Sequence, residues 1–146
     1  MLYSKTCERA IRALAYLAAR PHGELSLVDE IAEAEDMPRP FTSKILRDLV
    51  RAGILTSSRG RGGGYAMARD PAEVSLLEIM QIIDGADHID RCAVGLDLCN
   101  EYAPCPLHDK FQPIRKTIRA YLEGMTLAEM AGGLKRKRAI LKEETV

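Results

Sequence analysis

Three cysteines and one histidine lie close together in the second half of the chain. Cys92, Cys99 and Cys105 are separated by six and five residues, and His108 follows three positions after the last cysteine. This grouping indicates one metal ion or one iron–sulfur cluster, because thiolates spaced along a flexible loop can wrap such a cluster. Three cysteines and one histidine are also a common ligand set for structural zinc, although zinc sites usually contain a close C-x-x-C pair, which this loop lacks. Scattered free thiols are the remaining interpretation.

The fourth cysteine has a different setting. Cys7 shares the apolar stripe of a helix with Leu14, which favours a buried thiol that packs as a small hydrophobic residue. Glu8 lies next to it on a more polar face, where its simplest role is a weak ion pair with Arg12 one helical turn later.

Positive charge is concentrated in the middle of the chain. The whole sequence is balanced, with 21 basic and 21 acidic residues. Between residues 39 and 69, however, seven basic residues accompany a single acid, Asp48, whereas residues 24–36 hold six acids and no Lys or Arg. A neutral chain with one basic third is a candidate binder of a polyanion. We expect a second basic run, residues 135–138, to be a solvated surface.

The central basic residues fall on elements that suit DNA. A helix over about residues 40–52 has an apolar back and a polar outer face, and a hairpin with a glycine-rich tip follows it. A recognition helix needs long donors on its outer face, and a wing needs a thin charged tip. The glycines do not fit a nucleotide-phosphate loop, because no Lys-Ser or Lys-Thr opens a helix after them. The residues that we expect to contact DNA are Arg39, Thr42, Ser43, Lys44, Arg47, Arg51, Arg59, Arg61, Gly62, Gly63 and Gly64.

The other elements follow from apolar spacing and capping signals. Ser26, Ser75 and Thr126 each precede an acid by three residues, which predicts three helix starts. Gly85 and Gly124 are expected helix ends. Residues 86–109 show no periodicity. The expected ranges are helices at about 4–19, from 26 to the turn at 37–40, 40–52, 75–85 and 109–123, a hairpin at 54–68, and a short helix that begins at 126 and ends at 132–133.

Composition limits the class of protein. The chain has 146 residues, of which 47% are hydrophobic and 29% are charged, which is typical of a globular domain and excludes disordered, collagenous and membrane-spanning classes. The N-terminus lacks the order of a signal peptide, so we expect a cytoplasmic location and reduced cysteines. The predicted fold is mainly α with a small β-hairpin wing, that is, a winged helix-turn-helix domain followed by a long C-terminal helix.

The hairpin Arg59–Tyr65, the loop with three cysteines and the Thr126–Ala128 segment together resemble the IscR/NsrR family of winged-helix repressors and activators. The resemblance spans nearly the whole chain. It implies a homodimer that binds double-stranded DNA and, in many members, a 2Fe–2S or 4Fe–4S cluster that senses iron–sulfur status, nitric oxide, iron or redox state. Some members lack a cluster and sense thiol chemistry or metabolites.

By position, the resemblance makes Cys92, Cys99 and Cys105 the thiolate ligands. His108 falls where the IscR-like members have a ligating histidine, and Glu8 falls where the nitric-oxide sensors use a carboxylate from the partner subunit. The first cysteine gap is one residue longer here than in the best-known members, which leaves both cluster types open. The long helix would then pair with its twofold mate through Phe111, Ile114, Ile118, Tyr121 and Leu122.

We therefore expect a homodimeric, sequence-specific transcription regulator controlled by an iron–sulfur cluster. The expected organisation is a DNA-binding domain (1–85), a cluster loop (86–109), dimerisation helices (110–134) and a flexible basic and acidic tail (135–146). Two alternatives place a structural zinc or a thiol sensor at the same cysteines. A small iron–sulfur carrier would explain the cysteines but not the basic helix and wing. No nucleophile has a nearby base in the sequence, so we do not expect an enzyme.

Overall fold

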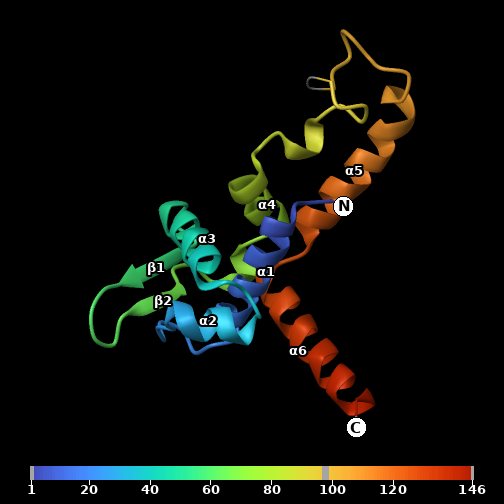
Figure 1. Cartoon of the computed structure of the whole chain (residues 1–146). Helices are drawn as coiled ribbons and strands as arrows, with labels where there is room; N and C mark the ends of the chain where they lie inside the picture. Colours follow the sequence, from blue (N-terminus) through green and yellow to red (C-terminus); the bar gives the residue numbers. More distant parts are fainter. Residues whose placement is uncertain (1, 97–98, 146) are drawn as a thin grey trace.

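The structure is a computed structural model that describes residues 2–96 and 99–145. Within these residues the chain is mainly helical and carries one antiparallel hairpin (Figure 1). The predicted fold class is confirmed. The elements are α1 (Lys5–Ala18), α2 (Val28–Ala34), α3 (Arg39–Arg51), β1 (Leu55–Ser58), β2 (Gly64–Met67), the short 3-10 turn η1 (Pro71–Glu73), α4 (Leu76–Asp84), the 3-10 turn η2 (His88–Asp90), α5 (His108–Gly124) and α6 (Leu127–Glu144).

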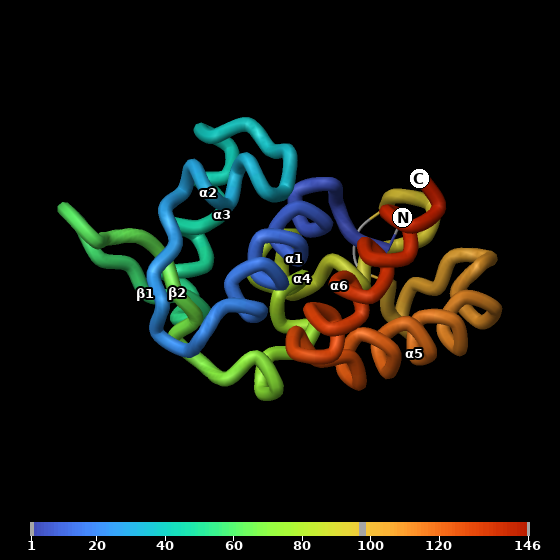
Figure 2. Tube along the Cα trace, turned by 90° about the horizontal axis from the view of Figure 1, so that it is seen from below, coloured from blue at the N-terminus to red at the C-terminus, as the bar shows by residue number. Residues whose placement is uncertain are grey.

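Helix α1 runs through the centre of the molecule (Figure 2). Its first turn is capped by Ser4, whose Oγ accepts a hydrogen bond from the Cys7 N–H at 3.0 Å. The Ser4 N–H in turn donates to Asp84 of α4 at 2.8 Å, which fixes the start of α1 against the end of α4. Leu14 and Leu17 are buried on the inner face. Each such leucine contributes about 1.5–3 kcal/mol relative to an exposed one.

The start of α2 differs from its prediction. The sequence predicts a cap at Ser26, but the N-cap is Leu27 and the helix begins at Val28. The Leu27 N–H donates to the Glu30 side chain at 2.7 Å. Ser26 is instead completely buried and pairs with Tyr65 of β2 through two backbone hydrogen bonds of 2.9 and 2.8 Å. The prediction is wrong because this long-range pairing outcompetes the local capping signal.

The hairpin lies in close contact with the segment before α2. Strands β1 and β2 are antiparallel, with Leu55 opposite Met67 and Ser58 opposite Gly64. Gly64 has a φ of +138°, and a Cβ at this position would lie 2.5 Å from the carbonyl oxygen of Ser26. Glycine is therefore required here for close contact between the hairpin and the segment before α2.

The second half of the chain is fastened to the first by a short backbone bridge. Ser75 and Thr126 lie opposite each other as an isolated antiparallel pair. Both cap their helices as predicted, because each hydroxyl accepts from the backbone N–H three residues later at 3.2 Å. The N–H groups of Leu76 and Leu127 donate across the bridge at 3.0 and 2.8 Å. The junction between α5 and α6 is thus held at the start of α4.

The long amphipathic helix predicted from the sequence is confirmed as α5, with one correction. Leu122 is completely buried in the core of its own chain, so it is not available for the partner subunit. Phe111 and Ile118 are half-buried. Ile114 and Tyr121 are 52% and 45% exposed, respectively, and form the apolar surface that α5 presents to solvent.

Helix α6 is longer than predicted. The expected end at Gly132–Gly133 is wrong, because the helix continues through both glycines to Glu144. The expected flexible tail is therefore helical for most of its length. A glycine inside a helix costs only about 1 kcal/mol relative to alanine, and packing of α6 on α1 and η1 offsets that cost.

Across the described residues, none of the helices combines the length and the apolar character that a membrane crossing demands.

Two glycine-to-alanine changes test these elements in opposite directions. Gly64→Ala is expected to lower the free energy of unfolding by about 1–3 kcal/mol, because of its positive φ and the Ser26 carbonyl. Gly133→Ala is expected to raise it by about 0.5–1 kcal/mol, since Gly133 is helical and has open space around it. Urea unfolding followed by circular dichroism measures both. A destabilised Gly133→Ala would contradict a helix that continues through the glycine pair.

Candidate nucleic-acid interface and cysteine loop

The outer face of α3 carries exposed cations. Arg47 is exposed and makes no ion pair among the residues that the structure describes. Lys44 and Arg51 are also exposed and share Asp48, each at 3.3 Å. Exposed pairs of this kind contribute little to stability, so both cations can exchange Asp48 for a phosphate at small cost.

The first turn of α3 departs in part from the expected DNA-contacting set. Arg39 is exposed and paired with Asp29 of α2, and Ser43 is half-buried. Thr42, which the sequence places on the outer face, is completely buried, and its hydroxyl donates to the Pro38 carbonyl at 3.0 Å. The correction has a physical reason: a threonine hydroxyl can bond a carbonyl four residues earlier, so its polarity does not require exposure.

The tip of the hairpin combines exposed charge with a tightly folded backbone. Arg59 and Arg61 are both exposed. Gly62 has a φ of +70° and open space around it. Gly63, in contrast, is buried, and a Cβ there would lie 2.4 Å from the carbonyl oxygen of Ser58. Gly63 therefore shapes the turn, and the two arginines supply its charge.

The segment with the cysteines is held against α5 by two arginines that no sequence motif points to. Arg115 is only 4% exposed and donates to the carbonyls of Ile89 and Arg91 at 2.7 and 3.0 Å. Arg119 pairs with both carboxylate oxygens of Asp90 at 3.0 Å. Sequence pattern does not reveal such contacts, because two of the acceptors are backbone carbonyls. The loop between α4 and α5 is thus tied to the helix that follows it.

The structure brings two of the four expected sulfur and nitrogen donors into contact and places the three cysteines around one hollow. The Sγ of Cys99 lies 2.8 Å from the Nδ1 of His108, which is 6% exposed at the start of α5. All three cysteines line one hollow of about 760 Å³. Among the residues described, no three such side chains converge on a single point.

The thiols of Cys92 and Cys7 differ in acidity. The pKa of Cys92 is lowered, chiefly by the backbone hydrogen bond from Val94 and also by Cys105 and the positive charge of Arg115. Burial raises the pKa of Cys7 to about 12, with smaller contributions from Asp84 and Glu8. Cys7 is completely buried, as predicted, and it is a protonated packing residue rather than a reactive thiol.

Glu8, the alternative fourth donor, lies in the first turn of α1 and is half-buried. It contributes to the raised pKa of Cys7 beside it. His108, at the start of α5, is the candidate fourth ligand that contacts one of the three loop cysteines, Cys99, within the same chain.

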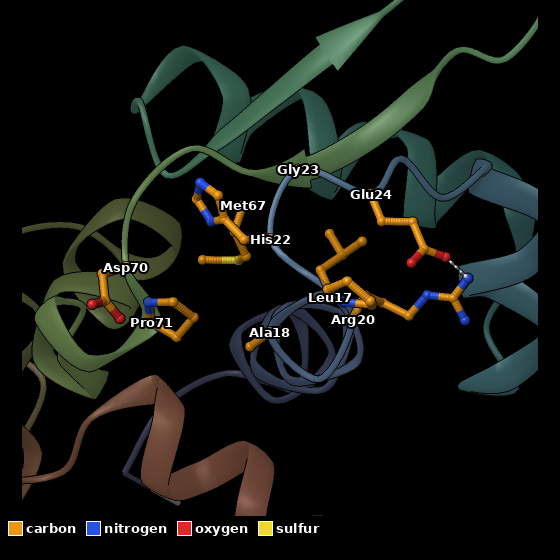
Figure 3. A pocket seen from close by; sticks show the side chains of 10 residues that line it. Leu17, Ala18, Arg20, His22, Gly23, Glu24, Met67, Asp70 and Pro71 are labelled. Carbon is orange, nitrogen blue, oxygen red and sulfur yellow. Dashed lines mark hydrogen bonds and ion pairs between the residues drawn. The ribbon is translucent and has the colours of Figure 1, made fainter.

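A further hollow of about 370 Å³ lies at the end of α1 near the base of the hairpin (Figure 3). Its charged groups have structural partners. Glu24 pairs with Arg20 at 2.7 Å, and Asp70 accepts the Ala72 N–H at 2.9 Å as the cap of η1. His22 is exposed at its rim. This arrangement gives no acid–base pair that could do chemistry.

Comparison with other proteins agrees with this geometry. The model of the Rrf2 family, described as an iron-dependent transcriptional regulator, matches residues 3–133. A protein of Aquifex aeolicus named as an HTH-type transcriptional regulator is 31% identical over 132 residues, which cover 89% of this chain and 91% of that protein. A protein of Mycobacterium tuberculosis with the same type of name is 36% identical over 134 residues, covering 91% of this chain and 83% of that protein.

Solved structures share the fold. IscR of T. potens aligns with a TM-score of 0.70 and 23% identity, covering 90% of this chain and 86% of that chain. CymR of B. subtilis, described as a global cysteine regulator, aligns with a TM-score of 0.70 and 21% identity, covering 88% of this chain and 95% of that chain. Taken with the helix–turn–helix pair, the wing and the match over residues 3–133, these findings show that the chain belongs to the Rrf2 family of DNA-binding transcriptional regulators, which are not enzymes.

Proposed function

We propose that this regulator binds a specific operator as a homodimer, and that a 2Fe–2S or 4Fe–4S cluster held by the cysteine loop controls its affinity for DNA. The observation that carries the proposal is the arrangement of Cys92, Cys99 and Cys105 around one hollow, with His108 bonded to Cys99. The description of the matching family as iron-dependent supports it.

The donor set fits an iron–sulfur cluster chemically. Cys92, Cys99 and Cys105 would supply thiolates and His108 an imidazole nitrogen, and this combination is found among cluster ligands. The lowered pKa of Cys92 favours the thiolate form that a metal requires. Cys92 and Cys105 would approach the Cys99–His108 pair across the hollow, a movement that an irregular loop allows. When bound, the cluster supplies metal–thiolate bonds that depend on redox state.

Control of DNA binding would pass through α5. Arg115 and Arg119 tie α5 to the cysteine loop, so a change in the loop acts directly on this helix. The exposed residues Ile114 and Tyr121 give α5 an apolar surface suited to a twofold mate. Pairing of α5 helices would set the distance between two copies of α3, and that distance must match the spacing of half-sites on DNA.

A regulator that senses thiol chemistry without a cluster is the second candidate. The lowered pKa of Cys92 favours it, as does the position of Cys105 on the same hollow, since a thiolate near a second thiol is the reactive arrangement for oxidation. The likeness to CymR, described as a cysteine regulator, is consistent with this candidate but extends to the fold alone. A structural zinc at the same residues is the third.

The cluster is tested by colour. Protein prepared without oxygen is expected to be brown, because sulfur-to-iron charge transfer absorbs visible light, and Cys92→Ala, Cys99→Ala or Cys105→Ala should each abolish the absorption. Cys7→Ala is the matched control and should retain it. Stoichiometric zinc in a colourless sample would favour the structural metal, and a metal-free sample whose thiols react with hydrogen peroxide would favour the thiol sensor.

The fourth ligand has its own test. His108→Ala is expected to destabilise the cluster or shift its spectrum and reduction potential, because the ligand set tunes both. Glu8→Ala should leave the spectrum unchanged. The reverse pattern would assign the fourth position to a carboxylate from α1.

DNA binding by the hairpin and by α3 is tested with an operator selected from random duplexes. Replacing Arg59 and Arg61 by Ala is expected to weaken binding to all sequences and to reduce the salt slope by about one unit for each phosphate that is no longer neutralised. Arg47→Ala should cost about 1–3 kcal/mol and relax specificity at one base pair, as removal of a bidentate base contact does. Lys110→Ala on α5 is the control for a general decrease in charge. An unchanged affinity and salt slope in the double arginine variant would remove the hairpin from the interface.

The dimer is tested on the exposed face of α5. Ile114→Glu is expected to weaken self-association by about 100-fold or more, because a charge would be buried between apolar surfaces. Gln112→Glu, on the other side of the helix, adds the same charge and should leave the dimer intact. Light scattering across a concentration series measures both, and an unaffected Ile114→Glu dimer would place the interface elsewhere.

A further inference from the structure

The distal part of α6 lies beyond residues 3–133, which the family model matches, yet it is attached to the helix–turn–helix pair. Arg138 donates to both carboxylate oxygens of Glu35, from Nη1 to Oε1 at 2.9 Å and from Nη2 to Oε2 at 2.6 Å. This parallel arrangement is the strongest form of the arginine–carboxylate pair. It joins positions 103 residues apart in sequence. We call it the Glu35–Arg138 clasp.

The carboxylate of this clasp depends on its arginine. The Glu35 side chain is 1% exposed, whereas that of Arg138 is 46% exposed. A buried carboxylate is costly unless it is paired and hydrogen-bonded. Arg138 is the cation that the described residues provide for Glu35. The rest of the basic run, residues 135–137, is exposed and makes no ion pair in the part of the chain that the structure describes.

Glu35 lies in the turn between α2 and α3, which sets the direction of α3. It ends α2, and Asp36 follows it with a φ of +50°, a backbone conformation that few residues other than glycine adopt. Met37 is buried, and its N–H donates to the carbonyl of Ala32 at 2.9 Å. The next residue, Pro38, is the N-cap of α3. A shift of Glu35 therefore changes the direction in which α3 leaves the turn.

We infer that Arg138 is a positioning residue for DNA recognition: by holding Glu35, it fixes the turn between α2 and α3 and so the angle at which α3 presents its outer face. This inference rests on the proposed reading of DNA by α3. It gives the C-terminal helix a role in specificity that does not require α6 to touch DNA.

Direct phosphate binding by the basic run is the competing explanation, and the two make different predictions. Removing a side chain that binds phosphate weakens binding to every sequence and lowers the salt slope. Removing a positioning side chain weakens binding to the operator, because base contacts need exact placement of α3, while binding to unrelated duplex and the salt slope stay as they were.

The experiment compares Arg138→Gln with Lys137→Gln in the full-length chain. Arg138→Gln is expected to weaken operator binding by about 3- to 30-fold, the range found for residues that act on a site from a distance. Its binding to unrelated duplex and its salt slope should match the wild type, and Lys137→Gln should be silent in all three measurements. Arg138→Lys, which keeps the charge but not the paired geometry, should recover part of the affinity.

Hydrogen exchange of backbone amides measures the stability of the turn between α2 and α3 in the absence of DNA. In Arg138→Gln the amide of Met37 should exchange faster, while the amide of Leu14 in the core of α1 keeps its rate, which separates a loosened turn from general unfolding. Equal weakening on operator and unrelated duplex, or an unchanged Met37 amide, would overturn the role of the clasp. A wild-type chain that prefers no duplex over another would instead overturn the proposed function itself.

Discussion

The other helices of the winged domain, one strand of its hairpin and the last helix all depend on one helix, α1, that has almost no free side. α1 packs against α2, α3, β2, α4 and α6. Ala10 and Ala13 are completely buried and, being small, allow the neighbouring helices to approach, while Leu14 and Leu17 fill the space between them. Because protein interiors are close-packed, a helix enclosed in this way cannot move relative to one neighbour without disturbing the others. Helix α3 with its basic outer face, strand β2 of the hairpin and the C-terminal helix therefore all pack on α1 (Figure 2).

Local signals in the sequence were sufficient where the structure is decided locally. The serine and threonine caps at Ser75 and Thr126 and the helix end at Gly85 are all confirmed. So is the hairpin, because strand-forming residues on both sides of a glycine-rich tip leave few other conformations. The basic outer face of α3 followed from the same periodicity, since Lys44 and Arg47 alternate with buried residues at helical spacing.

The predictions that failed were those that a partner elsewhere in the fold decides. Ser26 has the sequence of a helix cap, but its backbone pairs with Tyr65 of a strand far along the chain. Thr42 has the polarity of a surface residue but satisfies its hydroxyl on the preceding turn. Leu122 has the spacing of an interface residue, yet amphipathic periodicity cannot distinguish the core of one subunit from the interface with another. The pairing of Arg138 with the distant Glu35 leaves no local signal in the sequence for the same reason.

The cysteine loop is the segment that the core supports least. Its described residues between 86 and 107 are all exposed or half-buried, and its attachment to the rest of the molecule includes the polar contacts of Arg115 and Arg119. A segment without a hydrophobic core opens at low cost, so chemistry at its thiols meets little resistance. The two arginines, however, sit on a continuous helix, which does transmit displacement. In the proposed homodimer, a chemical change at Cys92 or Cys105 would therefore be passed by these polar contacts to α5, and it would alter the spacing of the two DNA-binding domains while the packing around α1 stays intact.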